Sequence, residues 1–284
     1  MSISHTQTAS STDRARLFRA LHESGRPLVL PNAWDVASAR VVEDEGAAAI
    51  ATTSAGVAWS LGAADGGRLD RDLAVGLVAR VAAAVGVPVT ADIEGGYADD
   101  PGGVATTVRD VVAAGAVGIN IEDARHSGPG ALRAVGEQAE RIAAAREAAD
   151  PAALFINARI DTYLLSSGDA ETRLADTLSR AEAYVAAGAD GIFVPGVTDP
   201  VLVLALVKGV GAPLNVLAGP GARTVTELAE LGVARVSLGS SIAEAAYTVV
   251  RRGAREVLTT GTYGTLAEAI GYGELNDLLR GSGT

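Results

Sequence analysis

Carboxylate side chains gather where three successive apolar stretches of the chain end. The acidic residues at these ends are Asp92 and Glu94, then Glu122 and Asp123, then Asp161. Successive side chains of an extended strand point to opposite faces, so Asp92 and Glu94 are expected on one side. Carboxylates that converge without a lysine favour a divalent cation. Ligation by oxygen alone, with room for water, favours Mg²⁺ or Mn²⁺.

One arginine, Arg159, stands among these acids. Its neighbours Phe155 and Ile156 are apolar, so we expect a buried guanidinium rather than surface charge. A planar guanidinium can bind a carboxylate or phosphate through two parallel hydrogen bonds, which suits a substrate anion. Two structural alternatives stay open: Arg159 pairs with Asp161 or Glu122, or the acids cap helices.

Scarce residue types exclude several chemistries. The chain has no cysteine, which excludes disulfides, thiolate metal sites and cysteine nucleophiles. Lys208 is the only lysine, so a Schiff-base mechanism has one candidate, in a helical stretch away from the strand ends. The histidines are His5, His22 and His126, so a three-histidine zinc site would need the N-terminal tail. Carboxylates are therefore the expected working groups.

The elements that position these residues are short β-rich runs that alternate with Ala-rich segments of helical periodicity, which indicates repeated βα units. Eight runs occur: Pro27–Pro31, Ala48–Thr53, Val87–Ile93, Val117–Glu122, Leu154–Ile160, Gly191–Pro195, Leu214–Leu217 and Arg235–Leu238. Most are continuously apolar, as expected of parallel strands covered on both faces. The sequence therefore predicts an α/β fold, a (β/α)₈ TIM-type barrel with its active site at the C-terminal ends of the strands. Gly115, Gly188 and Gly232 are expected to end helices.

An extra segment precedes the barrel units. Residues Asp13–Ser24 predict an amphipathic helix with Leu17, Phe18 and Leu21 on its apolar face. Residues 1–12 are rich in Ser and Thr and predict a mobile tail. They show no basic start that leads into an apolar stretch, so no secretory signal is visible, and we expect a cytoplasmic protein.

A second extra segment follows the barrel units. Residues 243–284 predict a C-terminal helical region, because Ala243–Val250 and Glu256–Leu279 repeat apolar residues at helical spacing. Amphipathic helix beyond the eight units needs a partner, so we expect copies of the chain to associate. No linker or change of composition divides the chain, and residues 1–284 are expected to form a single barrel domain.

Composition narrows the partners. The 284 residues are 48% hydrophobic and 20% charged, which is typical of globular proteins. The net charge of −11 would repel a phosphate backbone, so no nucleic acid partner is expected. The longest uncharged stretch, Gly46–Ala64, is interrupted by Gly, Ser and Thr, unlike a membrane span. The remaining expectation is a small-molecule substrate.

Five motifs in order carry a resemblance to a known family. They are Pro31-Asn32-Ala33, Thr52–Gly56 followed by Leu61–Asp65, Ala91–Tyr97, Ile121-Glu122-Asp123 and Ala158–Asp161. Together, over about residues 27–245, they resemble the isocitrate lyase/phosphoenolpyruvate mutase superfamily. The resemblance implies a Mg²⁺-dependent (β/α)₈ barrel that acts on 2-oxo acids. It also implies a homotetramer in which the last barrel helix is exchanged between paired subunits.

By position, the resemblance also implies a metal site. Asp92 would coordinate Mg²⁺ directly, while Glu94 and Glu122 would hold its water ligands together with Asp65. Glu94 stands where the superfamily more often has Asp, so one of the side chains that would hold the water ligands is longer by one methylene group. Glu122 and Arg159 also belong to the predicted catalytic group.

The resemblance implies substrate contacts as well. Ser54, Ala55 and Gly56 would bind the substrate, with amides near the first two around its carbonyl oxygen, and Asp92 would join this set. Arg159 would bind the distal or leaving part of the substrate. Asn215, in the seventh run, would contact the substrate from that strand.

Two departures from the superfamily narrow the reaction. The chain lacks the catalytic cysteine of the lyases, and Ala124–Arg141 lacks the Lys, Asn and Thr of the phosphonate members. His126 and Ser127 are the remaining candidates for proton transfer nearby, and histidine titrates in the useful range. Gly128-Pro129-Gly130 suits a closing lid over residues 124–136, with a static surface loop as the alternative.

These observations predict a Mg²⁺-dependent lyase that cleaves a C–C bond of a small 2-oxo acid through a pyruvate enolate. Decarboxylation and acylpyruvate-type cleavage both fit, because an enolate oxygen can be stabilised by a bound cation. Alternatives are P–C bond chemistry of the phosphoenolpyruvate mutase or phosphonopyruvate hydrolase type, or a non-catalytic 2-oxo-acid binder.

Overall fold

Nine parallel strands form a nearly closed barrel in the computed structural model, which describes residues 10–23, 25–126, 131–149 and 154–280. The strands are β1 (Leu28–Leu30), β2 (Asn32–Ala33), β3 (Ile50–Thr52), β4 (Val89–Asp92), β5 (Gly118–Glu122), β6 (Phe155–Arg159), β7 (Gly191–Val194), β8 (Leu214–Leu217) and β9 (Arg235–Ser237). Their order is β1-β9-β8-β7-β6-β5-β4-β3-β2. Since β1 and β2 are consecutive in the chain, the two edges of the sheet meet there, and the predicted barrel is confirmed.

The barrel seam lies at Pro31, where the first predicted strand ends: β1 lies within that predicted run, while β2 follows the proline and was not predicted. Proline has no backbone N–H, so it cannot donate to the ladder. β1 pairs with β9, and β2 pairs with β3. Asn32 joins both sides: its Nδ2 donates to the carbonyl of Thr52 at 3.0 Å, and its Oδ1 accepts from the amides of Leu238 and Gly239 at 2.9 Å each. A buried amide side chain thus bridges the gap in the backbone ladder.

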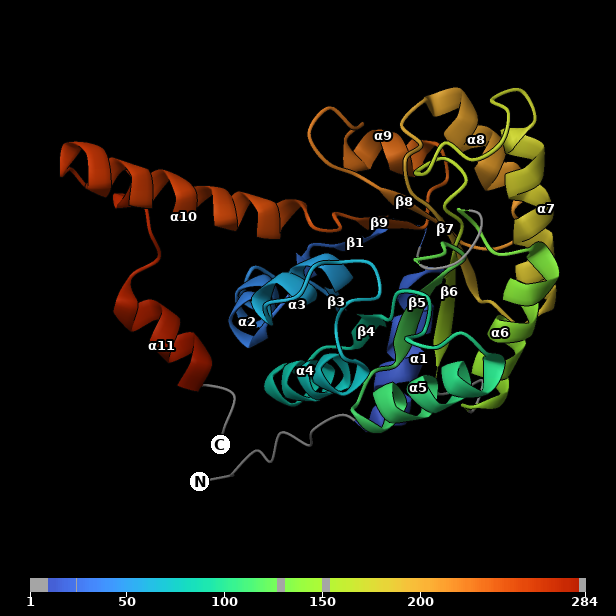
Figure 1. Cartoon of the computed structure of the whole chain (residues 1–284), viewed down its shortest axis with the longest axis horizontal. Helices are drawn as coiled ribbons and strands as arrows, with labels where there is room; N and C mark the ends of the chain where they lie inside the picture. The colour runs from blue at the N-terminus through green and yellow to red at the C-terminus, as the bar shows by residue number, and fades with distance from the viewer. Residues whose placement is uncertain (1–9, 24, 127–130, 150–153, 281–284) are drawn as a thin grey trace.

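Helices cover the outside of the barrel (Figure 1). Those of the barrel wall are α2 (Val36–Asp44), α3 (Ser54–Ser60), α4 (Arg71–Ala84), α5 (Pro101–Ala113), α6 (Val135–Glu147), α7 (Arg173–Ala186), α8 (Pro200–Gly209) and α9 (Val225–Glu230). Gly115, Gly188 and Gly232 follow α5, α7 and α9 with φ of 99°, 106° and 88°. Left-handed backbone of this kind favours glycine at helix ends, so these predictions are confirmed.

The first helix, α1 (Ser11–Leu21), begins earlier than predicted. Ser10 caps it by accepting from the amide of Asp13, so the helix includes residues 11 and 12, which were predicted to belong to the tail. Residues 1–9 lie outside the described part. Phe18 is fully buried, but Leu17 is 49% exposed, because Ala15 and Phe18 face the barrel instead. The Phe18 and Phe155 rings lie edge to face with centroids 5.7 Å apart, so α1 packs against the start of β6.

The C-terminal segment is helical, as predicted, but leaves the barrel. α10 (Ser241–Thr260) projects away from the strands, and after the short 3₁₀ turn η1 (Gly264–Leu266), α11 (Tyr272–Arg280) turns back (Figure 1). Arg40 of α2 donates through Nε to the carbonyl of Leu278 at 3.0 Å. Val250 and Leu258 on α10 are 65% and 84% exposed. None of the helices in the described ranges combines the length and apolar character that a membrane crossing requires.

The interior of the barrel is polar halfway down. Arg235 of β9 is 1% exposed, and its Nη2 donates to Oδ1 of Asn120 on β5 at 3.3 Å. Asn157 of β6 donates to the same oxygen at 2.9 Å. β5 and β9 are not neighbours in the sheet, so the first of these bonds crosses the inside of the barrel. Polar side chains rather than apolar ones therefore fill this layer of the barrel interior, directly below the strand ends.

Candidate active site

The predicted site residues lie at the C-terminal ends of three adjacent strands. Asp92 is the last residue of β4, Glu122 of β5 and Arg159 of β6. The parallel register pairs Glu122 with Arg159 and Asp92 with Asn120. Because the strands run parallel, their ends meet at one mouth of the barrel, where active sites of this fold lie.

Asp92 is held by the element beside it. The amide of Ser54, at the start of α3, donates to Oδ2 of Asp92 at 3.1 Å, and the amide of Asp92 donates to Oγ1 of Thr52 at 2.9 Å. Burial raises the pKa of Asp92, while the Arg159 guanidinium opposes the rise. A buried carboxylate with a raised pKa gains from a nearby cation. In this structure the Ser54 amide, predicted to bind substrate, is engaged by Asp92.

Gly56 and Ala55 follow in the same helix and are both buried. A Cβ at Gly56 would lie 2.8 Å from Cγ2 of Thr53 and 2.8 Å from Cβ of Trp34. Such distances are not tolerated, so a glycine lets α3 pack closely against the segment after β2. This close packing is by itself a sufficient reason for glycine at position 56 of the motif, whether or not Gly56 contacts the substrate.

Glu94 lies beyond the strand, in a turn. The predicted alternation ends at Asp92, because Glu94 has a left-handed φ of 50°. Its Oε2 accepts a short hydrogen bond from the Gly67 amide, and its Oε1 is buried without a partner among the described residues. Burial and the charges of Asp65 and Asp92 raise the pKa of Glu94 to about 7, although the Gly67 amide opposes the rise. Glu94 thus faces the site by a different backbone route from the one predicted.

Arg141 of α6 fixes this turn from behind. Its guanidinium is fully buried and donates to the carbonyls of Gly95, Ala98 at 2.8 Å and Asp99 at 2.7 Å. A planar fork with five donors can satisfy several carbonyls of one loop at once. The turn that presents Glu94 is therefore anchored to a helix of the barrel wall.

Arg159 pairs with both acids that the sequence offered as structural alternatives. Nη1 lies 2.8 Å from Oε2 of Glu122, and Nε donates to Oδ1 of Asp161 at 2.7 Å. Burial would raise the pKa of Glu122, but Arg159 and His126 hold it below its ordinary value. Burial raises the pKa of Asp161 to about 7 despite Arg159. The guanidinium is positioned by two carboxylates before any ligand arrives.

His126 bridges the acids of two strands. Its Nε2 lies 2.6 Å from Oε1 of Glu122 and 3.8 Å from Oε2 of Glu94. The hydrogen bond with Glu122 raises the pKa of His126, although burial opposes the rise. The imidazole is therefore charged more readily than a free histidine at neutral pH. Ser127 and Gly128-Pro129-Gly130 lie outside the described residues, and the predicted lid stays a prediction.

Asp65 and Asn215 are less closely engaged. Asp65 is exposed, and it raises the pKa of Glu94 and of His126 through charge alone. Asn215 of β8 is buried; its Oδ1 accepts from Ser237 at 3.1 Å, and its Nδ2 has no partner among the described residues. Lys208, the candidate for a Schiff base, lies in the last turn of α8, as the sequence indicated.

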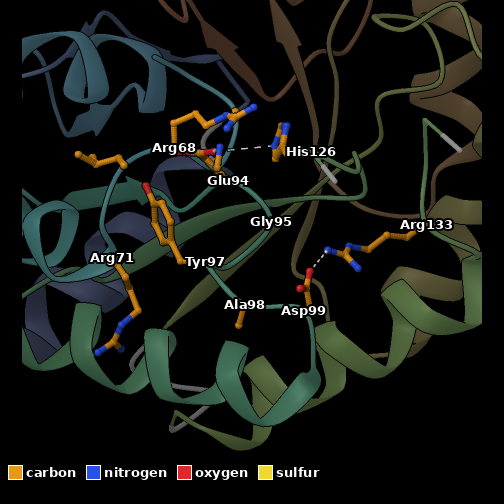
Figure 2. Close-up of a pocket in the computed structure, with 12 residues that line it drawn as sticks. Arg68, Arg71, Glu94, Gly95, Tyr97, Ala98, Asp99, His126 and Arg133 are labelled. Atoms are coloured by element: carbon orange, nitrogen blue, oxygen red, sulfur yellow. Dashed lines mark hydrogen bonds and ion pairs between the residues drawn. The ribbon is translucent and has the colours of Figure 1, made fainter. Parts of the chain in front are cut away.

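A pocket of about 370 Å³ opens beside the acids (Figure 2). Glu94, Tyr97 and His126 are among the residues that line it, and Figure 2 shows His126 facing Glu94. Sequence reasoning missed Tyr97 and Arg68 as pocket residues. The Gly95-Gly96 pair before Tyr97 was a usable signal, because glycines allow a turn that points the next side chain inward. Arg68 gave none, since an arginine in a polar loop is usually solvated.

Oxygen ligands for a cation are present, but no group of three or more acids or histidines in the described ranges is arranged to hold a metal directly. The Oε1 of Glu94 is buried without a partner among the described residues, and burial, followed by neighbouring acids, raises the pKa values of Asp92 and Glu94. A divalent cation that prefers oxygen fits this donor set.

Comparison with known proteins agrees with the architecture. The phosphoenolpyruvate phosphomutase family model matches residues 18–258. An uncharacterized protein of Mycobacterium tuberculosis is 44% identical over 78% of this chain and 81% of its own length. The 2-methylisocitrate lyase of Escherichia coli is 27% identical over 93% and 94%. A phosphonopyruvate hydrolase solved with oxalate and Mg²⁺ superposes with a TM-score of 0.82 at 26% identity, covering 93% of this chain and 94% of that one.

Proposed function

From the premise that this chain belongs to the phosphoenolpyruvate phosphomutase family, within a superfamily of lyases and mutases acting on 2-oxo acids, we propose a Mg²⁺-dependent C–C lyase. It would cleave a small 2-oxo acid through a pyruvate enolate, by decarboxylation or acylpyruvate-type cleavage. The observation that carries the proposal is the contact of His126 with Glu122, which in turn holds Arg159. A proton donor, His126, and a positively charged guanidinium, Arg159, thus both contact Glu122 at the barrel mouth.

Asp92 is the residue proposed to bind Mg²⁺ directly, with Glu94, Glu122 and Asp65 around its water ligands. The excess of buried carboxylate supports this assignment, as does the Mg²⁺ bound to the related phosphonopyruvate hydrolase. When bound, the ion would stabilise negative charge on the carbonyl oxygen of the substrate. Mn²⁺ prefers the same ligands and would substitute.

The side chains of the chain itself supply positioning and a proton. Arg159, fixed by Glu122 and Asp161, presents its guanidinium to an anionic part of the substrate. His126, with a raised pKa, would protonate the enolate carbon from Nε2 once its bond with Glu122 opens. This chain has no cysteine, so the histidine takes the place of the usual acid.

P–C bond chemistry is the second candidate, and the likeness to a phosphonopyruvate hydrolase favours it. The same guanidinium would accept a phosphonate in place of a carboxylate, because both anions suit its fork. The absence of Lys, Asn and Thr from residues 124–141 weighs against it.

A substrate panel tests both candidates. Oxaloacetate, an acylpyruvate and phosphonopyruvate are each assayed for pyruvate and phosphate, with Mg²⁺ and with a chelator. Mg²⁺-dependent pyruvate from either of the first two, without phosphate from the third, is the expected result. Phosphate release alone would replace the proposal with the second candidate, and tight 2-oxo-acid binding without turnover would indicate a binding protein.

We also propose that the protein forms a homotetramer built from two dimers, and that the two subunits of each dimer exchange α10. Besides the exposed apolar residues of α10, a hollow of about 860 Å³ lies beside β1 and α2, lined by Leu28, Val29, Val42 and Ile242 among others. An apolar hollow and an unpacked apolar helix on one chain suit reciprocal packing between two copies. Light scattering at micromolar concentration should give a tetramer mass, and a monomer mass would contradict the proposal.

A further inference from the structure

The pocket outside the acidic cluster contains one arginine, Arg68, that no acid in the described part of the chain pairs with. Three arginines line this pocket: Arg68, Arg71 and Arg133. Arg71 donates to Asp110 at 2.6 Å and to Asp72 at 2.8 Å. Arg133 donates to Glu137 at 2.6 Å and faces Asp99 in Figure 2. Arg68 is exposed and has no hydrogen bond or ion pair with any residue that the structure describes.

The loop that carries Arg68 is fixed beside His126. Gly66 and Gly67 have left-handed φ of 89° and 73°. A Cβ at Gly66 would lie 3.2 Å from Nδ1 of His126, and one at Gly67 would lie 3.4 Å from its Cβ, so the backbone packs directly on the imidazole. The Gly67 amide donates to Glu94. Arg68 is the next residue, so its backbone is anchored, although its side chain has no partner within the described ranges.

Figure 2 shows the direction of each side chain. The Arg68 guanidinium lies on the same side of the pocket as His126, whereas Arg71 points away toward the helix below. Asp92 does not line this pocket, but Glu94 and His126 do. The pocket therefore lies outside the cluster, where the tail of a substrate would lie if its 2-oxo acid head sits at Asp92.

We propose that Arg68 binds a terminal carboxylate of the substrate, distal to the 2-oxo acid head. This inference rests on the proposed function, because it takes the position of the head from it. A guanidinium with free donors forms charge-assisted hydrogen bonds with a carboxylate. A volume of about 370 Å³ is sufficient for a short carbon tail between the two ends. The substrate class is a 2-oxo acid with a second, terminal carboxylate.

The test compares three probes by calorimetry on the full-length protein with Mg²⁺ present. 2-Oxoadipate and 2-oxohexanoate have six carbons each, but the first ends in a carboxylate and the second in a methyl group. Oxalate, the third probe, has no carbon tail. The wild-type protein should bind 2-oxoadipate about tenfold more tightly than 2-oxohexanoate. Arg68→Met should abolish this preference and leave oxalate affinity within about twofold, while Arg68→Lys should retain part of it.

Arg71→Met is the matched control, since Arg71 lines the same pocket but is already paired. It should keep the preference. Loss of the preference in Arg71→Met to the same extent would show a general charge effect and overturn the proposal, as would its persistence in Arg68→Met or its absence from the wild type. Failure of oxalate to bind the wild type would instead count against the proposed function of the head site.

Discussion

The mouth of the barrel and the layer below it each contain an arginine, in opposite surroundings: the Arg159 side chain is 18% exposed, and Arg235 is 1% exposed. At the mouth, Arg159 has Glu122 and Asp161 within 2.8 Å, and these acids raise its pKa although burial opposes them. Below, Arg235 makes one long bond to an amide oxygen, and its Nε and Nη1 have no partner among the described residues. Burial lowers the pKa of Arg235 to about 9.

The difference separates two uses of a buried charge. Arg159 belongs to a network of ion pairs, which fixes the position of its guanidinium. Its removal would leave Glu122 and Asp161 buried without their cationic partner. Arg235 has no carboxylate in hydrogen-bond contact in the described ranges, and the one acid that favours its charged form is Asp92, above it. The lower layer therefore supplies positive potential, while the upper layer supplies defined contacts.

The largest expected effect tests the upper layer alone. Asp92→Ala should abolish Mg²⁺ binding and lower turnover at least about a thousandfold, because it removes the side chain that we propose binds the ion directly. The fold should persist, since the residue lies at the mouth. Isothermal titration with Mg²⁺ and circular dichroism check both parts, and Mg²⁺-dependent turnover in the variant would contradict the metal assignment.

A matched pair of substitutions tests the contrast directly. Arg159→Met should lower the free energy of unfolding by about 3–5 kcal/mol, because Glu122 and Asp161 lose their partner. Arg235→Met should change it by about 1 kcal/mol or stabilise the protein, because a poorly paired charge is replaced by an apolar chain of similar length. Urea denaturation of both variants gives the comparison. Equal losses would show that the two arginines are held alike.

The histidine at the mouth should act on turnover rather than on metal affinity. His126→Gln keeps a polar side chain beside Glu122 but cannot carry the proton, so we expect turnover to fall about a hundredfold. Mg²⁺ affinity should change by less than about threefold, which is under 1 kcal/mol, because His126 is not among the residues proposed to hold the ion. Steady-state kinetics and metal titration separate the two. Unchanged turnover would leave His126 a structural bridge.

The smallest effect concerns pH in metal-free protein. The pKa of Glu94 is about 7 in the folded chain and 4.5 ordinarily, so the folded state binds the extra proton between these values. The free energy of unfolding of the wild type should therefore fall as pH rises from 5 to 7.5. The fall should exceed that of Glu94→Gln by about 2 kcal/mol. Thermal unfolding with a chelator measures this difference, and millimolar Mg²⁺ should reduce it. A wild type that gains stability over this range relative to Glu94→Gln would contradict the assignment.

Much of the barrel could be predicted because burial on both faces leaves a direct trace in the sequence. Each observed strand except β2 lies inside a predicted apolar run, and the ends of three of these runs placed Asp92, Glu122 and Arg159 at one edge of the sheet. The break at Pro31 was visible only as a proline. The apolar periodicity of α1 misplaced Leu17, because two neighbouring faces of that helix carry large apolar residues and only packing selects one.

The site was harder to predict in its details. Strand alternation cannot describe Glu94, whose left-handed turn depends on Arg141 from a helix more than forty residues away. The sequence offered Glu122 and Asp161 as alternative partners of Arg159, and only the distances show that both bind it. Gly66 and Gly67 matter through their approach to His126, a contact between loops that no local pattern records.

The pairing of β1 with β9 also has a consequence for biosynthesis. Leu28 must pair with Arg235, so the first strand has no neighbour on one side until roughly 200 more residues have been made. At about 5–20 residues per second, this takes roughly 10–40 s on the ribosome. During that time the apolar edge of β1 is open to other chains. The wait should make the nascent protein depend on chaperones more than its final stability would suggest.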